Sequence, residues 1–285
     1  MTERPRVFLM LAPVLAVIVF LFLGGLAFGL LQSFNYLPFI EKYDFNFDAY
    51  SNIFNSRSFR SSLLLTLWIA LASTLISSVL AIVCALVLRR VQRARQFMTF
   101  LFQLNLPIPH TVGAIMVLLL FSQSGYFSRL THAVGLTGGP ADFPALVQDP
   151  WAIGVILEYV WKETPFIGIN VLAALAGLGM GHEEVAQTLG ANRWQRLRHV
   201  ILPSVMPSML ASSIIVFAFS FGAFEIPYLL AATAPTTLSV LAFRSYSDVD
   251  LNARSDAMAM SVIVAVFITV LVYVYARLTR RFVRS

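Results

Sequence analysis

Ionisable side chains within long apolar stretches are the residues of this sequence best placed to do chemistry. Glu158, Lys162 and Glu163 share one such stretch, and Glu225 lies in another, two residues before Pro227. Charged groups at membrane depth are costly, so they first suggest solute or ion pathways and proton relays. The i, i+4 spacing of Glu158 and Lys162 also permits a structural pair in which the two charges neutralise each other. We therefore expect Glu163 and Glu225 to be the better pathway residues; a solvated Glu225 near the outer end of its helix is the alternative.

Two prolines and a histidine form a second candidate, in the segment NLPIPHT. Pro107 and Pro109 lack backbone N–H donors and are predicted to bend the helix around them. Broken helices at membrane depth are tolerated where they are buried in protein or line a cavity. His110 is expected either to face a pore or, as a lone histidine more commonly does, to bond to a neighbouring backbone. The same reasoning predicts a broken or kinked helix at Pro227.

Several chemistries are excluded by the residues that the chain lacks. Its lysines are Lys42 and Lys162, preceded by Glu41 and Trp161, so neither stands in the Gly-Lys-Ser/Thr sequence of a phosphate-binding loop. Cys84 is the single cysteine, which excludes an intramolecular disulfide and a cysteine-based metal site. The sequence contains no metal-ligand cluster and no catalytic triad. We therefore expect a non-enzymatic chain that binds no cofactor and no metal of its own.

The elements that position these residues are predicted to be transmembrane helices. The 285 residues are 58% hydrophobic and 12% charged, and the mean hydropathy is +0.79, whereas soluble proteins have roughly 25% charged residues. Since about 20 apolar residues span a bilayer, six stretches qualify: 7–31, 61–88, 97–121, 151–176, 208–231 and 256–277. The first is too long for the core of a signal peptide, so we expect it to be retained. The fold class expected is an all-α integral membrane protein, with residues 1–285 forming one transmembrane domain.

The distribution of basic residues predicts the orientation of these helices, because cytoplasmic loops are enriched in Arg and Lys. With both termini in the cytoplasm, the cytoplasmic side holds Arg4, Arg6, Arg89, Arg90, Arg93, Arg95, Arg193, Arg196, Arg198, Arg277, Arg280, Arg281 and Arg284. The other side then holds Lys42, Arg57, Arg60, Arg129, Arg244 and Arg254. The first group is about twice the second, so we expect both termini inside. Scattered over short loops, these arginines do not suggest nucleic-acid binding.

One predicted cytoplasmic loop, residues 177–207, combines charged and apolar residues at helical spacing. Its central stretch reads EEVAQTLGANRWQRLRHVILP. Glu183 and Glu184 suit the positive end of a helix dipole. The apolar residues form two patches, Val185, Ala186 and Leu189 before Gly190, and Trp194, Leu197 and Ile201 after it. We expect a short amphipathic helical pair that Pro203 and Pro207 terminate before the fifth span.

Three interpretations of this helical pair are open on pattern alone. The first is an interfacial helix whose arginines contact anionic lipid. The second is a solvated loop, which the ordered apolar patches disfavour. The third is a docking element whose apolar side chains fit a groove on a cytoplasmic partner.

The spacing of this stretch resembles a motif in the permease subunits of bacterial binding-protein-dependent ABC importers. That motif is Glu-Ala-Ala, three residues, Gly, nine residues, Ile, one residue and Leu-Pro. Here Glu184-Val185-Ala186, Gly190, Val200 and Leu202-Pro203 have the same spacing. Val185 and Val200 depart from the motif but stay apolar. The motif also precedes the next-to-last predicted span, as it does in the family.

The resemblance implies a multi-pass permease of a type I ABC importer in the bacterial cytoplasmic (inner) membrane. It implies a coupling role toward an ATPase for Glu183, Glu184, Val185, Ala186, Leu189, Gly190, Arg193, Trp194, Leu202 and Pro203. The implied partners are a dimer of ATPase subunits that bind ATP and Mg, a second permease that is identical or homologous, and an extracytoplasmic solute-binding protein. Membrane lipid is a further expected partner.

The cargo is less constrained by the sequence. The stretch FGAFEIPYLL is similar to the spermidine/putrescine-type subgroup, which implies a small polar solute, and the intramembrane acids favour a polyamine-like cation. One alternative is an ion-coupled secondary transporter or channel with Glu158, Glu163 and Glu225 as its proton relay. Another is a non-transporting scaffold that only recruits a partner. The motif and the lack of a visible inverted repeat argue against the first alternative.

Overall fold

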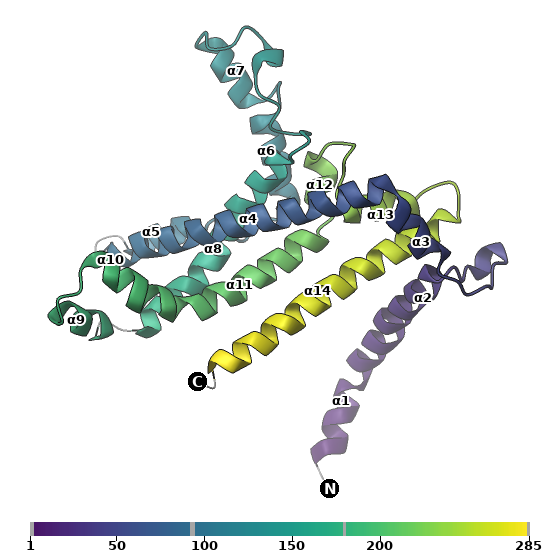
Figure 1. Cartoon of the computed structure of the whole chain (residues 1–285), viewed down its shortest axis with the longest axis horizontal. Helices are drawn as coiled ribbons and strands as arrows, with labels where there is room; N and C mark the ends of the chain where they lie inside the picture. Colours follow the sequence, from purple (N-terminus) through teal and green to yellow (C-terminus); the bar gives the residue numbers. More distant parts are fainter. Residues whose placement is uncertain (1–2, 92–94, 179–180, 284–285) are drawn as a thin grey trace. The chain divides into compact units, whose positions relative to one another are not determined.

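The computed structural model describes residues 3–91, 95–178 and 181–283, which form a helical chain (Figure 1). The α-helices are α1 (Glu3–Val17), α2 (Gly24–Ser33), α3 (Asp48–Asn55), α4 (Arg57–Arg90), α5 (Arg95–Gln103), α6 (His110–Phe121), α7 (Tyr126–Ala133), α8 (Ile153–Leu178), α9 (Gly181–Thr188), α10 (Arg193–Arg196), α11 (Leu202–Gly222), α12 (Glu225–Leu230), α13 (Leu238–Tyr246) and α14 (Ala253–Val283). The π-helices η1 (Ile18–Leu23) and η4 (Leu197–Ile201) and the 3₁₀-helices η2 (Pro38–Ile40) and η3 (Pro140–Asp142) complete the set. Arg93 and Arg284, both assigned to the cytoplasmic side above, lie outside the described residues.

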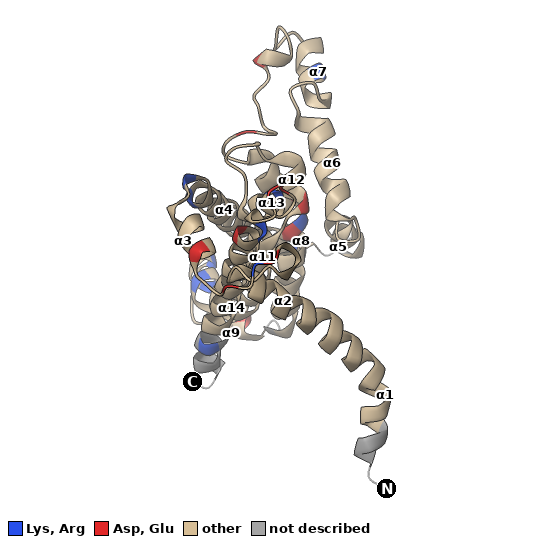
Figure 2. Cartoon of the chain, turned by 90° about the vertical axis from the view of Figure 1, so that its right-hand side faces the viewer, with Lys and Arg blue, Asp and Glu red and all other residues tan. Residues whose placement is uncertain are grey.

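Membrane-spanning helices account for most of the described chain. Five are long and apolar enough to cross a bilayer, or six if the bent pair Ile153–Gly177 and Gly181–Thr188 is a single span. The all-helical membrane class predicted from the sequence is therefore confirmed, and the predicted number of spans falls within this range. In Figure 2 charged residues are sparse along the helices, as the composition leads one to expect.

The predicted third span, residues 97–121, has the wrong bounds. Helix α5 ends at Gln103 and α6 begins only at His110, and the apolar helical span runs from His110 to Ala133. Proline disfavours α-helical geometry in the residue before it. Pro107 and Pro109 therefore disfavour helical geometry at Leu106 and Ile108, and the chain makes turns instead of helix between α5 and α6.

The predicted fifth span, residues 208–231, is also shifted. The apolar span runs from Arg193 to Gly222, and a break at Ala223 and Phe224 separates it from α12. Pro203 and Pro207 do not terminate the preceding helix, contrary to expectation, because the π-turn η4 widens it just before Pro203 and shifts the carbonyl that a proline ring would otherwise meet.

The break between α11 and α12 comes before Glu225, whereas Pro227 comes after it. Pro227 is the third residue of α12, where its missing N–H would have had no helical partner in any case. A broken helix near Glu225 was predicted correctly, but Pro227 is compatible with helix α12 and does not cause the break.

The helices group into two compact units. The first comprises residues 1–60 and 238–266, and the second comprises residues 61–237 and 267–285. In the first unit the buried amide of Asn35 links three segments: its Nδ2 donates to Asn46 Oδ1 (3.0 Å), and its Oδ1 accepts from Ser255 Oγ (2.9 Å). The Arg254 guanidinium lies over the rings of Phe39 and Tyr246, 5.1 Å from each centroid.

Helix α8 is the central element of the second unit, and α6, α11 and α12 pack against it. One apolar cluster joins Leu65 and Ile69 of α4 to α6, α8 and α12, and a second joins Ala81 and Ala85 of α4 to α8 and α11. Most hydroxyl residues of α4 are buried, from Ser62 to Ser78, and Ser78 Oγ lies 2.7 Å from Ser213 Oγ on α11. Small polar residues thus allow close packing here.

Gly154 permits the closest approach of a loop to α8, which gives a test of the packing. A Cβ at this position would lie 2.7 Å from the backbone oxygen of Leu146 and 3.3 Å from Val147 Cγ2. Gly154→Ala should therefore destabilise the protein by about 1–3 kcal/mol, as overpacking does. Gly177→Ala is the matched control, because a Cβ at Gly177, on the same helix, meets no atom within 4 Å. Thermal unfolding of purified protein in detergent measures both, and equal midpoints would contradict the packing described.

Candidate functional site

The segment 181–203, termed here the amphipathic segment, forms a helical pair as predicted. Helix α9 begins with Glu183 and Glu184 in its first turn. Gly190 has φ +85°, a left-handed conformation that favours glycine, and it turns the chain between α9 and α10. Asn192 then caps α10 reciprocally: its Oδ1 accepts from the Gln195 backbone N–H (2.9 Å), and Gln195 Oε1 accepts from the Asn192 N–H (2.8 Å).

Two polar contacts hold the amphipathic segment in place. Arg89, at the end of α4, forms an ion pair with Glu183 at 2.6 Å. Arg196 Nη1 donates to Gln187 Oε1 at 2.8 Å and so joins α10 to α9. Figure 1 shows α10 beside the end of α4, in agreement with these contacts. The segment is therefore attached to a membrane-spanning helix through its first turn.

The apolar residues of α9 face away from the rest of the chain. Val185 is 59% exposed and Leu189 is 82% exposed. The second predicted patch does not form one surface, because Trp194 is 67% exposed while Ile201 is buried against α8 and α4. The π-turn η4 lies between these two residues and alters the helical spacing on which that prediction relied. Val185 and Leu189 therefore remain the exposed part of the predicted apolar surface.

Six polar residues of α6, α8, α11 and α12 form the second candidate, termed here the polar cluster: His110, Thr111, Glu158, Glu163, Ser220 and Glu225. Thr111 Oγ1 donates to Glu225 Oε2 at 2.9 Å, and Ser220 Oγ donates to Glu163 Oε1 at 2.9 Å. His110 Nδ1 lies 3.3 Å from Glu158 Oε1, and its ring is tilted by 34° against that of Phe219, with the centroids 4.8 Å apart. The cluster thus connects four helices through three side-chain pairs.

The pathway residues predicted from the sequence divide into exposed and buried sets. Glu225, Pro107 and Pro109 are exposed, and His110 is partly exposed. Glu163 and Pro227 are buried in the chain. The exposed set lies where the break between α5 and α6 approaches the break between α11 and α12, as the Thr111–Glu225 hydrogen bond demonstrates.

Lys162 has a different partner from the one expected. The i, i+4 spacing suggested Glu158, but Glu158 faces His110, and Lys162 Nζ donates to backbone carbonyls of the turn between α5 and α6. Its acceptors are Asn105 O (2.6 Å), Leu106 O (3.0 Å) and Ile108 O. The two prolines end regular helix there, and the lysine ammonium supplies the donors that these carbonyls would otherwise lack.

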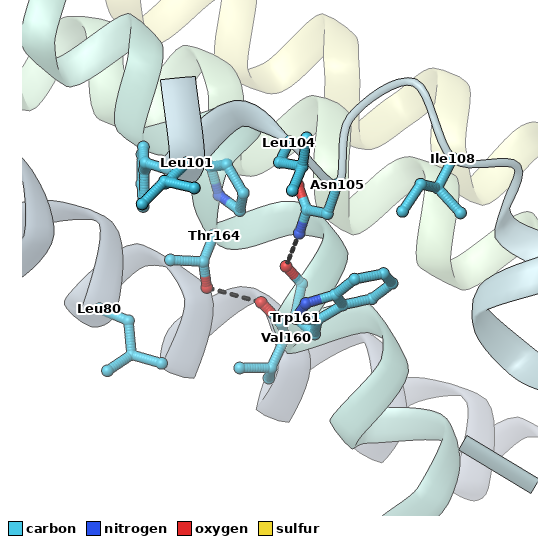
Figure 3. A pocket seen from close by; sticks show the side chains of 10 residues that line it. Leu80, Leu101, Leu104, Asn105, Ile108, Val160, Trp161 and Thr164 are labelled. Carbon is cyan, nitrogen blue, oxygen red and sulfur yellow. Dashed lines mark hydrogen bonds between the residues drawn. The ribbon is translucent and has the colours of Figure 1, made fainter. Parts of the chain in front are cut away.

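A cavity of about 410 Å³ lies beside the same break, between α4, α5 and α8 (Figure 3). Its walls are mostly apolar, from Leu80, Leu101, Leu104, Ile108, Val160 and Trp161. Two polar groups at its edge are paired, since Asn105 Nδ2 donates to Trp161 O and Thr164 Oγ1 donates to Val160 O, whereas the buried Asn105 Oδ1 has no partner among the described residues. Because Leu101 and Leu104 are exposed, this cavity opens on an apolar outer surface and does not suit a polar solute.

Sequence reasoning missed Arg89, Lys162 and Thr111 as parts of these sites. Arg89 was counted only as a topology signal, and its partner Glu183 is 94 positions away. A signal existed for Lys162, since a buried lysine needs several acceptors and a double-proline turn exposes carbonyls. Nothing in the sequence points to the Thr111–Glu225 contact, which depends on the packing of α6 against α12.

Comparison with known proteins gives the following similarities. A family model described as "Binding-protein-dependent transport system inner membrane component" matches residues 77–285. The sulfate transport system permease protein CysT of Salmonella typhimurium is 29% identical over 160 residues, which cover 56% of this chain and 54% of that protein. The trehalose transport system permease protein SugA of Mycobacterium tuberculosis is 30% identical over 246 residues, which cover 84% of this chain and 77% of that protein. This chain therefore matches about half the length of the first relative and most of the second.

A solved structure has a similar fold. A chain in the crystal structure of a bacterial ABC transporter involved in the import of the acidic polysaccharide alginate superimposes with a TM-score of 0.80 at 23% identity. The similarity covers 98% of this chain and 96% of that chain. At this level of sequence identity, the similarity shows that the two chains share a fold.

The contacts of Lys162 give the prediction of this subsection. Lys162→Met keeps the length of the side chain but leaves buried carbonyls without donors, so the protein should lose on the order of 3 kcal/mol of folding free energy. The only other lysine provides the control: Lys42 makes a single 3.4 Å side-chain contact, with Asn252, and Lys42→Met should change stability by less than about 0.5 kcal/mol. Thermal unfolding in detergent measures both. Equal stability of the two variants would contradict the assigned role of Lys162.

Proposed function

The chain belongs to the family of inner-membrane components of binding-protein-dependent transport systems, and we propose that α9 is the element through which a separate ATPase subunit drives its transport cycle. As a member of this family it is a multi-pass transport component and not an enzyme. In the proposed orientation both termini and the amphipathic segment face the cytoplasm. A dimer of ATPase subunits, which binds ATP and Mg, would lie beneath.

One observation carries the coupling role: Val185 of α9 and Leu189, which directly follows α9, are exposed while an ion pair fixes the first turn of α9 to α4. An apolar surface provides contact with a partner, and the ion pair to Arg89 resists displacement of α9 relative to the spans. A loosely attached loop would move without displacing the spans when the ATPase moves, whereas an attached helix transmits that displacement to them. The Gly190 turn and the capped helix α10 give the surface a fixed shape.

The solute pathway is proposed to pass the exposed part of the polar cluster. Glu225 and His110 lie on helices that begin at breaks in the third and fifth spans, and broken spans at membrane depth are tolerated where they face a cavity. In a single chain this surface is open, so a second permease, identical or homologous, would close the pathway from the other side. The span Val7–Ser33 is largely exposed in its own chain, apart from the buried Gln32 and Ser33 at its end, and offers further surface to that permease or to lipid.

The cargo is proposed to be a small polar solute delivered by an extracytoplasmic binding protein. The exposed pathway residues are rich in acceptors, which suits solutes that donate hydrogen bonds. Polyamine-like cations and sugars both do so. A sugar as the cargo is supported by the relative that is named for trehalose. The cation is supported by the carboxylate of Glu225 alone, since neither relative reported above is named for polyamines.

The rival functions differ in their energy source. An ion-coupled transporter with a proton relay through Glu158, Glu163 and Glu225 would import solute without an ATPase, and a scaffold would not import it. Each is disfavoured by family membership. Uptake into vesicles that contain the complex, with ATP inside and an ionophore present, separates the three functions. Uptake that needs an ion gradient but no ATP would exclude the proposed function.

Gly190 tests the coupling role. Gly190→Trp adds bulk at an exposed turn where a Cβ meets no atom within 4 Å, and because a φ of +85° strains a tryptophan, equal membrane abundance is required before a loss is assigned to a partner. ATP-driven uptake should fall by at least about tenfold, because overpacking of a close interface costs about 1–3 kcal/mol. Gly190→Asn is the control, since asparagine tolerates the left-handed conformation and remains small. Equal uptake by both variants, at equal membrane abundance, would contradict docking at this turn.

Glu225 tests the pathway. Glu225→Gln removes the charge but keeps an oxygen that can accept from Thr111, so the fold and the membrane abundance should not change. The initial rate of ATP-driven uptake should change about three- to fivefold, the effect of one partly solvated charge interaction. Glu41→Gln, in an exposed loop of the first unit, is the control. A wild-type rate in Glu225→Gln would place Glu225 outside the pathway.

A further inference from the structure

A cationic cavity lies between the end of α4 and the amphipathic segment, and the proposed function does not use it. It has two adjoining compartments of about 500 Å³ and about 420 Å³, each within the size range of small-molecule sites. Both compartments are lined by Leu86, Arg90, Glu183, Arg196 and Ile201. Arg193, Trp194 and Leu197 complete the larger compartment, and Arg89, Glu184 and Gln187 complete the smaller one.

The arginines of the larger compartment outnumber its acids by three to one. The single acid, Glu183, is already paired with Arg89. Arg196 uses one nitrogen for Gln187, and its buried Nε has no partner among the described residues. The guanidinium groups of Arg90 and Arg193 make no hydrogen bond or ion pair with any residue that the structure describes. Two unpaired guanidiniums on facing elements are suited to an anion with several oxygens, such as a phosphate.

The location of the cavity identifies the source of that phosphate. Arg90 is the last residue of the span Arg57–Arg90, and Arg193 is the first residue of the span Arg193–Gly222. The cavity therefore lies at the charged ends of two helices that are apolar enough to cross a membrane, and basic side chains at such ends are suited to lipid headgroups. Leu86, Leu197 and Ile201 continue its wall toward the apolar part of these spans. An anion with an attached hydrocarbon chain fits this cavity, because the anion would contact the arginines and the chain would contact the apolar wall.

We propose that this cavity binds the headgroup of an anionic phospholipid, with Arg90 and Arg193 contacting its phosphate and Trp194 lying at the headgroup level. The lipid would bridge α4 to α10 and so reinforce the attachment that the Arg89–Glu183 pair gives to α9. Any effect of the lipid on ATPase coupling depends on the function proposed above, whereas lipid binding itself does not.

Lipid retention by the assembled transporter complex tests this proposal. The complex, purified in detergent, is incubated with phosphatidylglycerol or phosphatidylcholine and analysed by native mass spectrometry. The wild type should retain phosphatidylglycerol in preference to phosphatidylcholine. Arg90→Gln combined with Arg193→Gln should reduce this retention by about tenfold, the effect of losing a charge-assisted hydrogen bond. Arg90→Gln alone should reduce it by a smaller factor.

The control removes the same charge elsewhere. Arg57→Gln combined with Arg198→Gln changes two exposed arginines that do not line the cavity, and it should retain phosphatidylglycerol like the wild type. Equal loss in both double variants would mean that net charge alone attracts the lipid and would overturn the site. Displacement of the lipid by millimolar inorganic phosphate would assign the cavity to a free anion and would contradict the proposal that it binds a lipid headgroup. Because retention needs no ATP hydrolysis, it can succeed or fail independently of the coupling tests.

Discussion

The structure depends on one constraint: every backbone carbonyl and N–H at membrane depth must find a partner inside the protein. The prolines at 107 and 109 violate regular helix in the middle of the chain, and the freed carbonyls are satisfied by Lys162 of α8. The Lys162 ammonium and the free carbonyls would each be unfavourable alone at membrane depth. By hydrogen bonding to each other, both are satisfied. The break and the lysine are stable only together, and this fixes α6 against α8.

The polar cluster follows from this fixed arrangement. Once α6 starts at His110, its first turn presents His110 to Glu158 and Thr111 to Glu225. The second break, at Ala223 and Phe224, brings Glu225 to the same place from α12. Two interruptions of regular helix therefore create a polar surface among apolar spans, and this surface is where the pathway is proposed to pass. Burial divides its acids into one exposed carboxylate, Glu225, and two enclosed ones, Glu158 and Glu163.

Much of the architecture could be predicted because bilayer thickness and hydrophobic length leave few choices. The helical class, the number of spans and the helical pair around Gly190 all follow from local patterns. The bounds of the third and fifth spans could not be predicted, since apolar composition continues through both breaks and only backbone geometry reveals them. The π-turn at Leu197–Ile201 is similarly invisible in a hydrophobicity pattern. Contacts between distant positions, such as Arg89 with Glu183, depend on tertiary packing that no local pattern contains.

The continuous helical span Arg193–Gly222 has a mechanical consequence. Thirty residues of helix extend about 45 Å at 1.5 Å per residue. Its first end carries Trp194 in the amphipathic segment, and its last end adjoins the break before Glu225. No loop lies between these ends, although the π-turn η4 and Pro207 interrupt the regular α-helical hydrogen bonding, so a rotation or tilt of the first end is carried along the helix to the break at Ala223 and Phe224. A small tilt of the first end of this span would then move its last end at the break and widen or narrow the space beside Glu225.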